Sequence, residues 1–255
     1  MRVISFLGAL IIIWIVIAWA FNIAWVPTAS RWIESWIKSW FGENAPSPQP
    51  PISDQEPLPP SVVHEIQELV GRLLKSMRIV PWANSDVLRG LYYRKDYAKM
   101  LGWIKNSMRL DLHVELRIVG TTHQTPPIQN TPMWIELPGK MPLFGTPQFR
   151  YTHVIVNVRK DLLDTKSLAY VVAGFAHELS HVVLNTIQHE LQHNEKAVDL
   201  TAMILGYGAF ITDAEIIKTV RASFDPYVET ERLGYLTSTE ARFALRHLSE
   251  LSRKP

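Results

Sequence analysis

The chain contains no cysteine, so disulfide bonds and thiolate metal sites are excluded, and any metal must be held by histidine and carboxylate side chains. A cysteine-free chain suits either side of a membrane, so the redox compartment stays open. No continuous stripe of Lys and Arg follows residue 60, and the formal net charge is only +2. We therefore expect no nucleic-acid partner.

Charge is also missing from the N-terminus, where residues 3–26 carry none. About 20 apolar residues are enough for a helix to cross the hydrocarbon core, so this run predicts a single membrane-spanning anchor. A cleaved signal peptide is the alternative, because Arg2 precedes the run and Ala18-Trp19-Ala20 fits a cleavage site. The length of the run favours the anchor. Such a short N-terminal tail usually stays inside, which places the rest of the chain on the extracytoplasmic side.

Two different segments follow this run. Trp32, Trp36 and Trp40 recur every four residues and share one helical face with other apolar residues, which predicts an amphipathic helix lying in the membrane interface. A helix packed on the domain is the alternative. Seven prolines then indicate a semi-rigid extended linker. The predicted organisation is an anchor over residues 1–27, an interfacial helix over 28–44, a Pro-rich linker over 45–61 and a domain over 62–255.

The 62–255 segment combines two kinds of hydrophobic pattern. Its composition, 47% hydrophobic and 20% charged over the whole chain, is typical of a folded protein. Apolar residues at helical spacing predict helices over 61–78, 84–108, 164–185 and 194–205, with more helix toward the C-terminus. Short β-branched or aromatic runs predict strands over 112–120, 133–137 and 151–158. This order predicts an α+β domain with a small antiparallel or mixed sheet.

The pattern His-Glu-x-x-His occurs twice, over residues 177–181 and 189–193. Histidines four residues apart lie on one helical face, where two imidazoles can bind one Zn²⁺ and the Glu after the first His flanks the metal. The first copy lies inside an apolar, uncharged run that would exclude water from a catalytic centre. The second copy is followed at once by Glu195 and Lys196 and has a solvated pattern. We therefore assign the site to the first copy.

A third ligand is available downstream of the first copy. Glu195 and Asp199 are four residues apart, so both carboxylates project from one face of a helix. Glu195 would complete the ligand set of His177 and His181 and leave a position for water, while Asp199 would orient a ligand histidine. This arrangement requires the motif helix to end near Thr186 and the chain to turn back antiparallel.

In this arrangement the second copy straddles the turn, so we expect His189 and His193 to be surface residues. Two alternatives remain. The second copy could be the site, but its only nearby carboxylates, Asp213 and Glu215, lack the Glu-x-x-x-Asp spacing. The four residues of the first assignment could also be core histidines and a solvated helix face, although their mutually consistent positions favour a metal site.

These residues resemble the gluzincin zinc metallopeptidases, and among them the compact, membrane-tethered kind similar to HtpX-like and CAAX-prenyl-protease-like enzymes. The resemblance rests on VIVNVRKDLL (154–163), AHELSHVV (176–183) and NEKAVDLTAMILGYG (194–208). It implies a zincin-like fold in which Zn²⁺ is bound by His177, His181 and Glu195, Glu178 is the base and Asp199 supports a ligand. One departure is that only 13 residues separate His181 from Glu195, fewer than in most gluzincins.

The expected activity is hydrolysis of peptide bonds in a protein or peptide substrate, with Glu178 taking a proton from a metal-activated water. An open strand edge, at 112–120 or 133–137, could pair with an extended substrate. The alternatives are an inactive zincin-fold protein that acts as a membrane-anchored binding or scaffold protein, and a membrane-remodelling protein that works through its Trp helix. A further donor for the oxyanion is also expected. The candidate donors are Tyr207, Tyr227, Arg232 and His247.

Overall fold

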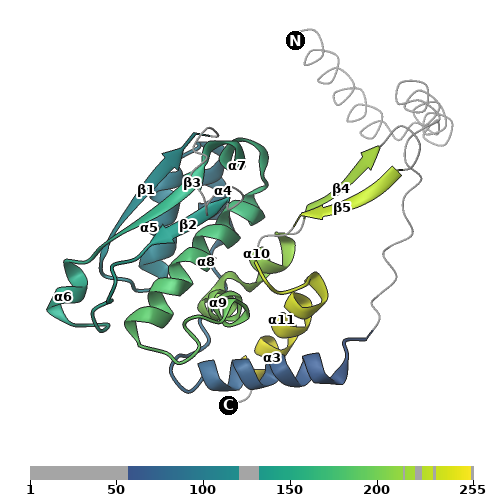
Figure 1. The fold of residues 1–255 in the computed structure, drawn as a ribbon, viewed down its shortest axis with the longest axis horizontal. Coiled ribbons are helices and arrows are strands. Elements are labelled where there is room, and N and C mark those ends of the chain that lie inside the picture. Colours follow the sequence, from purple (N-terminus) through teal and green to yellow (C-terminus); the bar gives the residue numbers. More distant parts are fainter. Residues whose placement is uncertain (1–56, 121–131, 215, 222–225, 232–233, 254–255) are drawn as a thin grey trace, which may run out of the picture. The chain divides into compact units, whose positions relative to one another are not determined.

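The computed structural model describes residues 57–120, 132–214, 216–221, 226–231 and 234–253 (Figure 1). All the described residues belong to one compact unit, Glu56–Pro255. The predicted anchor, the interfacial helix and the linker as far as residue 56 lie outside the described residues. Within the part of the chain that the structure describes, no helix is long and apolar enough to cross a membrane.

Three helices open the described unit. Helix α3 (Pro60–Leu73) starts with a proline, which is well tolerated there because the N–H groups of a first helical turn have no partner within the helix. The helix ends at Leu73, before the predicted residue 78. Helices α4 (Ser85–Tyr93) and α5 (Tyr97–Ser107) replace the single helix predicted over 84–108. The helix breaks because Lys95 adopts a left-handed backbone conformation with a φ of 56°.

The sheet has three strands, β1 (His113–Val119), β2 (Met133–Glu136) and β3 (His153–Arg159), in the order β1-β3-β2. Strand β1 is parallel to β3 and β2 is antiparallel to it, so the sheet is small and mixed, as predicted. β2 is therefore an outer strand of this sheet. This topology leaves one side of β2 without a strand partner among the described residues, which matters for the pocket described below.

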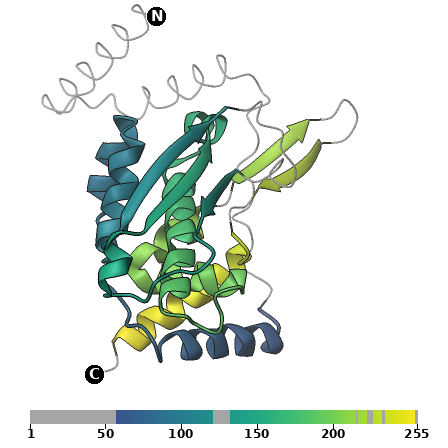
Figure 2. The ribbon, with the colours of Figure 1, turned by 60° about the vertical axis from the view of Figure 1, so that its left-hand side comes forward.

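The two faces of the sheet differ in character. Val154, Val156 and Val158 of β3 are fully buried and join the core with the apolar residues of α5 and α8. Figure 2 shows the ribbons of these helices beside the sheet. On the alternate positions, Asn157 donates a hydrogen bond to Glu136, which is also paired with Arg117 of β1. One face of the sheet therefore belongs to the core and the other carries a polar network.

The second half of the described chain is mostly helical. After α6 (Pro147–Arg150) and α7 (Lys160–Thr165) come the long helix α8 (Leu168–Thr186) and the shorter α9 (Glu195–Ala202). A π-helical turn, Met203–Tyr207, leads into α10 (Gly208–Asp213), and α11 (Ser238–Ser252) ends the fold. The architecture is α+β, as the sequence predicts.

The prediction of helix throughout the C-terminal region is wrong between α10 and α11. Strands β4 (Ile216–Arg221) and β5 (Pro226–Glu231) pair there as an antiparallel hairpin. Four of the six residues of β4 are β-branched, which favours a strand, while β5 has Val228 and Thr230. Pro226 stands at the first position of β5, where a missing N–H is tolerated.

Candidate metal centre

Helix α8 carries the first His-Glu-x-x-His through the middle of the core. Ser167 caps its N-terminus by accepting a hydrogen bond from the Tyr170 N–H, and most of the helix is buried. The His177 and His181 rings lie one turn apart with centroids 5.0 Å from each other and planes at 81°. The helix therefore presents two imidazoles side by side, as two ligands of one metal require.

The second His-Glu-x-x-His begins as α8 ends. Gln188 has a φ of 52°, and the N–H groups of Gln188 and His189 donate to the carbonyls of Asn185 and Leu184 at 3.1 and 2.9 Å. These bonds form a Schellman motif, which stops the helix before the second copy can form one. The predicted turn after Thr186 is thus confirmed, and the two histidines of the second copy do not share a helical face.

The two histidines of this second copy have different environments. His193 is exposed, as predicted. The prediction of a surface position is wrong for His189, which is only 7% exposed. Its Nδ1 accepts a hydrogen bond from the Leu191 N–H at 3.1 Å. The ring is buried because this bond holds it inside the turn.

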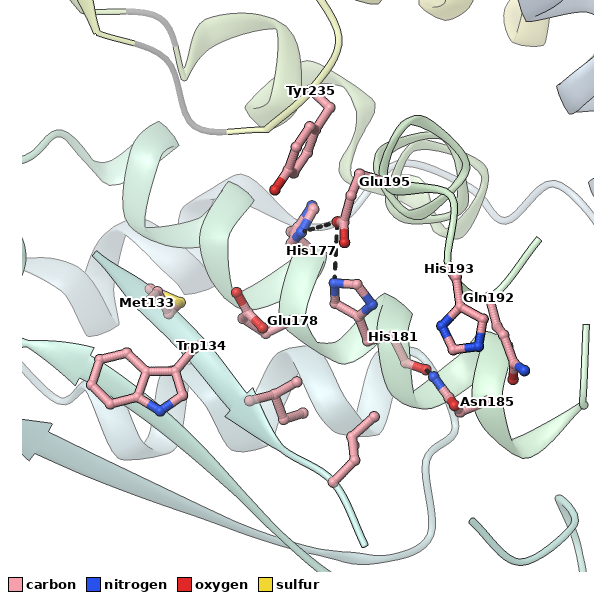
Figure 3. A pocket seen from close by; sticks show the side chains of 12 residues that line it. Met133, Trp134, His177, Glu178, His181, Asn185, Gln192, His193, Glu195 and Tyr235 are labelled. Atoms are coloured by element: carbon pink, nitrogen blue, oxygen red, sulfur yellow. Dashed lines mark hydrogen bonds and ion pairs between the residues drawn. The ribbon is translucent and has the colours of Figure 1, made fainter. Parts of the chain in front are cut away.

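Glu195 returns to α8 at the first position of α9. Asn194 caps this helix by accepting the Ala197 N–H at 3.0 Å, which sets where the helix begins. Glu195 Oε2 lies 3.4 Å from His177 Nε2 and 3.4 Å from His181 Nε2 (Figure 3). The possible ligand atoms of the three residues all lie within 4.8 Å of one another, so the structure brings together a group that could hold a metal ion.

Asp199, one turn after Glu195, supports this group from the inside. Its side chain is 1% exposed, and its Oδ1 lies 2.7 Å from Nδ1 of His177. A carboxylate only accepts hydrogen bonds, so Nδ1 keeps a proton and Nε2 is the nitrogen that faces Glu195. The predicted supporting role of Asp199 matches this geometry.

Without a metal, a proton on His177 supplies positive charge to the cluster. Burial by itself lowers the His177 pKa, but hydrogen bonds to Asp199 and Glu195 outweigh it and raise the pKa to about 10. Burial and the nearby charge of His177 lower the pKa of His181 to about 4. The hydrogen bond from His177 lowers the pKa of Glu195. A metal cation would therefore find the Glu195 carboxylate already ionised.

Glu178 lies beside the cluster and is 8% exposed. Burial raises its pKa to about 7, against the opposing pull of His177 and of a hydrogen bond from the backbone N–H of Ile135. Ile135 belongs to the outer strand β2, so this bond connects the motif helix to the sheet edge. A carboxyl with a pKa near neutrality can both take up and give back a proton at physiological pH.

These groups open onto a cavity of about 460 Å³ between β2, α8 and the start of α9. The cavity is lined by Met133, Trp134, Ile135, Leu137, His177, Glu178, His181, Asn185, Gln192, His193, Glu195 and Tyr235 (Figure 3). One wall is thus apolar and comes from β2, while the opposite wall carries the possible metal ligands. Pockets with this division of apolar and polar groups are common binding sites.

Tyr235 is the pocket residue that sequence reasoning missed. Its ring stacks on that of His177 with centroids 6.1 Å apart and planes at 20°. Burial and the nearby carboxylates raise its pKa, so the hydroxyl stays protonated at neutral pH. Neither periodicity nor motif spacing indicates this residue, because it reaches the site from a segment 36 residues after Asp199. Its only local sequence mark is the preceding Gly234.

Of the four predicted oxyanion donors, two lie away from the cavity and the structure does not describe the side chains of the other two. Tyr207 is fully buried, and its hydroxyl is hydrogen-bonded to Ser107 instead of facing the cavity. His247 stacks on Phe243 within α11 and is not among the residues that line the cavity. Tyr227 lies on β5, where only the backbone is described, and Arg232 lies outside the described residues. The structure therefore does not bring Tyr207 or His247 to the site.

Comparisons of the chain with known protein families, with curated proteins and with solved structures find no match. What the centre can do must therefore be inferred from its own residues.

Proposed function

We propose that this protein is a zinc-dependent metallopeptidase, anchored to a membrane through residues 1–27 and active through the cluster of His177, His181 and Glu195. The observation that carries the proposal is the convergence of these three side chains at one end of a cavity, with the buried carboxyl of Glu178 beside them. A purely structural metal site would need neither a cavity nor an adjacent base.

The donor set fits Zn²⁺. Two imidazole nitrogens and one carboxylate oxygen suit this ion, and three protein ligands leave a position for water, as catalytic zinc sites do. The contact of His177 with Asp199 fixes the tautomer that binds a metal through Nε2. Zn²⁺ bound by these groups would lower the pKa of a water molecule and polarise a carbonyl group.

Glu178 is proposed as the general base. It would take a proton from the attacking water and pass it to the amine that leaves when the peptide bond breaks. The environment of Glu178 supports this role, because burial holds the pKa of its carboxyl at about 7 in the metal-free protein. A carboxyl with an ordinary pKa would take up that proton less readily.

The outer strand β2 is proposed to bind the substrate. Four of the residues that line the cavity come from β2 or directly follow it, namely Met133, Trp134, Ile135 and Leu137. No strand pairs with its outer side among the described residues, where the Ile135 N–H donates to Glu178. An extended peptide could pair with that side and lay its scissile bond across the cluster, with apolar side chains against the β2 wall. This favours β2 over β1 as the pairing edge, since no β1 residue lines the cavity.

Metal analysis and activity together test the proposal. The full chain, purified in detergent and loaded with zinc, should hold one ion by elemental analysis and cleave members of a quenched fluorescent peptide library. His177→Ala and Glu195→Ala should lose the ion. His189→Ala is the matched control from the second copy of the motif, and it should keep the ion because His189 only closes a turn.

The catalytic part of the proposal is tested separately by Glu178→Gln. This variant should keep the metal and lose about 10²- to 10⁴-fold in kcat, the usual contribution of a general base. A wild-type protein that binds zinc but cleaves no peptide would instead support the inactive binding or scaffold alternative. Loss of the metal from His189→Ala alone would overturn the assignment to the first copy.

A further inference from the structure

Tyr235 has an unusual environment for a large aromatic side chain. It is 59% exposed, although its ring stacks on the buried His177 and lines the cavity. Its hydroxyl makes no hydrogen bond to any of the described residues. Figure 3 shows the hydroxyl pointing toward the side of the pocket on which Glu178 lies. A hydrogen-bond donor that has no partner in the described part of the chain therefore lies beside the group of residues that would carry out hydrolysis.

The backbone of Tyr235 is held by the same carboxylate that orients His177. Asp199 Oδ2 accepts the N–H groups of Tyr235 and Leu236 at 2.6 and 3.0 Å, while Oδ1 contacts His177. Asp199 is buried, so these hydrogen bonds are shielded from water and correspondingly strong. One side chain thus fixes the position of a predicted metal ligand and of the free hydroxyl relative to each other.

Gly234 makes this close approach possible. Its φ of 97° is in the left-handed region that side chains disfavour, and a Cβ at this position would lie only 2.7 Å from Asp199 Oδ2. The chain therefore passes directly over the Asp199 carboxylate before Tyr235 turns into the cavity. A segment that only connected the hairpin to α11 would not need such a tight contact.

We propose that Tyr235 is a catalytic residue that donates its phenolic hydrogen bond to the substrate carbonyl oxygen as that oxygen gains negative charge. The inference rests on the proposed peptidase function and adds to it the oxyanion donor. Water adds to the carbonyl carbon, the carbonyl π electrons move to the oxygen, and Tyr235 stabilises that charge while keeping its own proton. Glu178 alone accepts the proton of the water, so no further reactant is needed.

Tyr235→Phe tests this role, because it keeps the ring on His177 and removes only the hydroxyl. We expect kcat to fall about 10²- to 10³-fold, as for other oxyanion donors, with KM and zinc content unchanged. Tyr151→Phe is the matched control: Tyr151 is 81% exposed and does not line the cavity, so this variant should behave as the wild type.

A second measurement does not depend on turnover. Calorimetry with a phosphonamidate peptide, which mimics the tetrahedral state, should show a similar loss of affinity in Tyr235→Phe on a Glu178→Gln background. Affinity for the uncleaved peptide should stay the same there. Equal kcat and equal phosphonamidate affinity in Tyr235→Phe and the wild type would overturn this inference and leave the peptidase assignment intact. A wild type that cleaves no peptide would overturn both.

Discussion

Asp199 Oδ1 lies 2.7 Å from Nδ1 of His177, and this contact determines which nitrogen of the ring faces Glu195. Because the carboxylate can only accept, Nδ1 keeps its proton and the Nε2 lone pair becomes available once the proton shared with Glu195 leaves. Metal binding by His177, as proposed, would therefore depend on a residue that lies outside the group of possible ligands.

Asp199→Asn should weaken zinc binding while preserving the fold. The amide oxygen can still accept from the backbone N–H groups of Tyr235 and Leu236, which leaves the NH₂ group facing His177. Nδ1 must then accept and the proton moves to Nε2, the nitrogen needed for the metal. We expect zinc affinity to fall about 10- to 100-fold, measured by competition with a chelating indicator dye.

Asp213→Asn provides the control for this substitution. Asp213 is exposed at the end of α10, so the same chemical change there should leave zinc affinity unchanged. If Asp199→Asn bound zinc as tightly as the wild type, the tautomer would not be set by Asp199.

Zinc binding should release at least one proton per ion at pH 8, the proton that His177 carries, and any further proton would come from the metal-bound water. His177 has a pKa of about 10 in the metal-free protein, so it is protonated at pH 8 and must lose the proton from Nε2. Glu178 has a pKa of about 7, so at this pH it is mostly ionised and releases little. Zinc affinity should accordingly rise at least about tenfold per pH unit between pH 8 and 9, and fall as the pH falls.

Calorimetric titration in buffers of different ionisation enthalpy measures the number of protons released. Glu178→Gln is the control for the source of the proton, since this variant should still release the proton of His177 when zinc binds. A heat of binding that is independent of the buffer would contradict the assignment of the proton to His177.

The centre of the site could be predicted from sequence because its parts are local. His177 and His181 are related by one helical turn, and so are Glu195 and Asp199, so the 3.6-residue period fixes each pair without knowledge of the fold. The short interval between the pairs then allows only a tight turn. The structure provides it with a non-glycine residue, Gln188, in the left-handed conformation, and this choice could not be read from the sequence.

The missed features depend on contacts between distant parts of the chain. Tyr235 reaches the cavity because Asp199, 36 residues earlier, binds its backbone. His189 is buried because its ring accepts a backbone hydrogen bond inside the turn, although the next residue, Glu190, is charged. The break at Lys95 within the predicted 84–108 helix likewise could not be predicted, because no glycine or proline occurs at that position. Local patterns therefore predicted the cluster of His177, His181 and Glu195, but not the residues that tertiary contacts bring to it.

Tyr207→Phe should affect stability and leave the site unchanged. Burial raises the pKa of Tyr207 to about 12, and its hydroxyl is hydrogen-bonded to Ser107. Removing that hydroxyl should cost about 1 kcal/mol of unfolding free energy, measured by urea denaturation, with zinc content and kcat as in the wild type. A loss of kcat at unchanged KM would mean that the Tyr207 hydroxyl reaches the substrate after all.

Gly234→Ala should lower both the free energy of unfolding and the affinity for zinc. The left-handed φ of 97° costs about 1–3 kcal/mol for a residue with a side chain, and the new Cβ would press on Asp199 Oδ2 from 2.7 Å. Because Asp199 cannot move away without leaving His177, zinc affinity should fall together with the free energy of unfolding. Gly139→Ala is the control, since a Cβ there meets nothing within 4 Å and should change neither quantity. If Gly234→Ala were destabilised but bound zinc with wild-type affinity, Asp199 would be free to adjust, and its hydrogen bonds to the Tyr235 segment would not position His177.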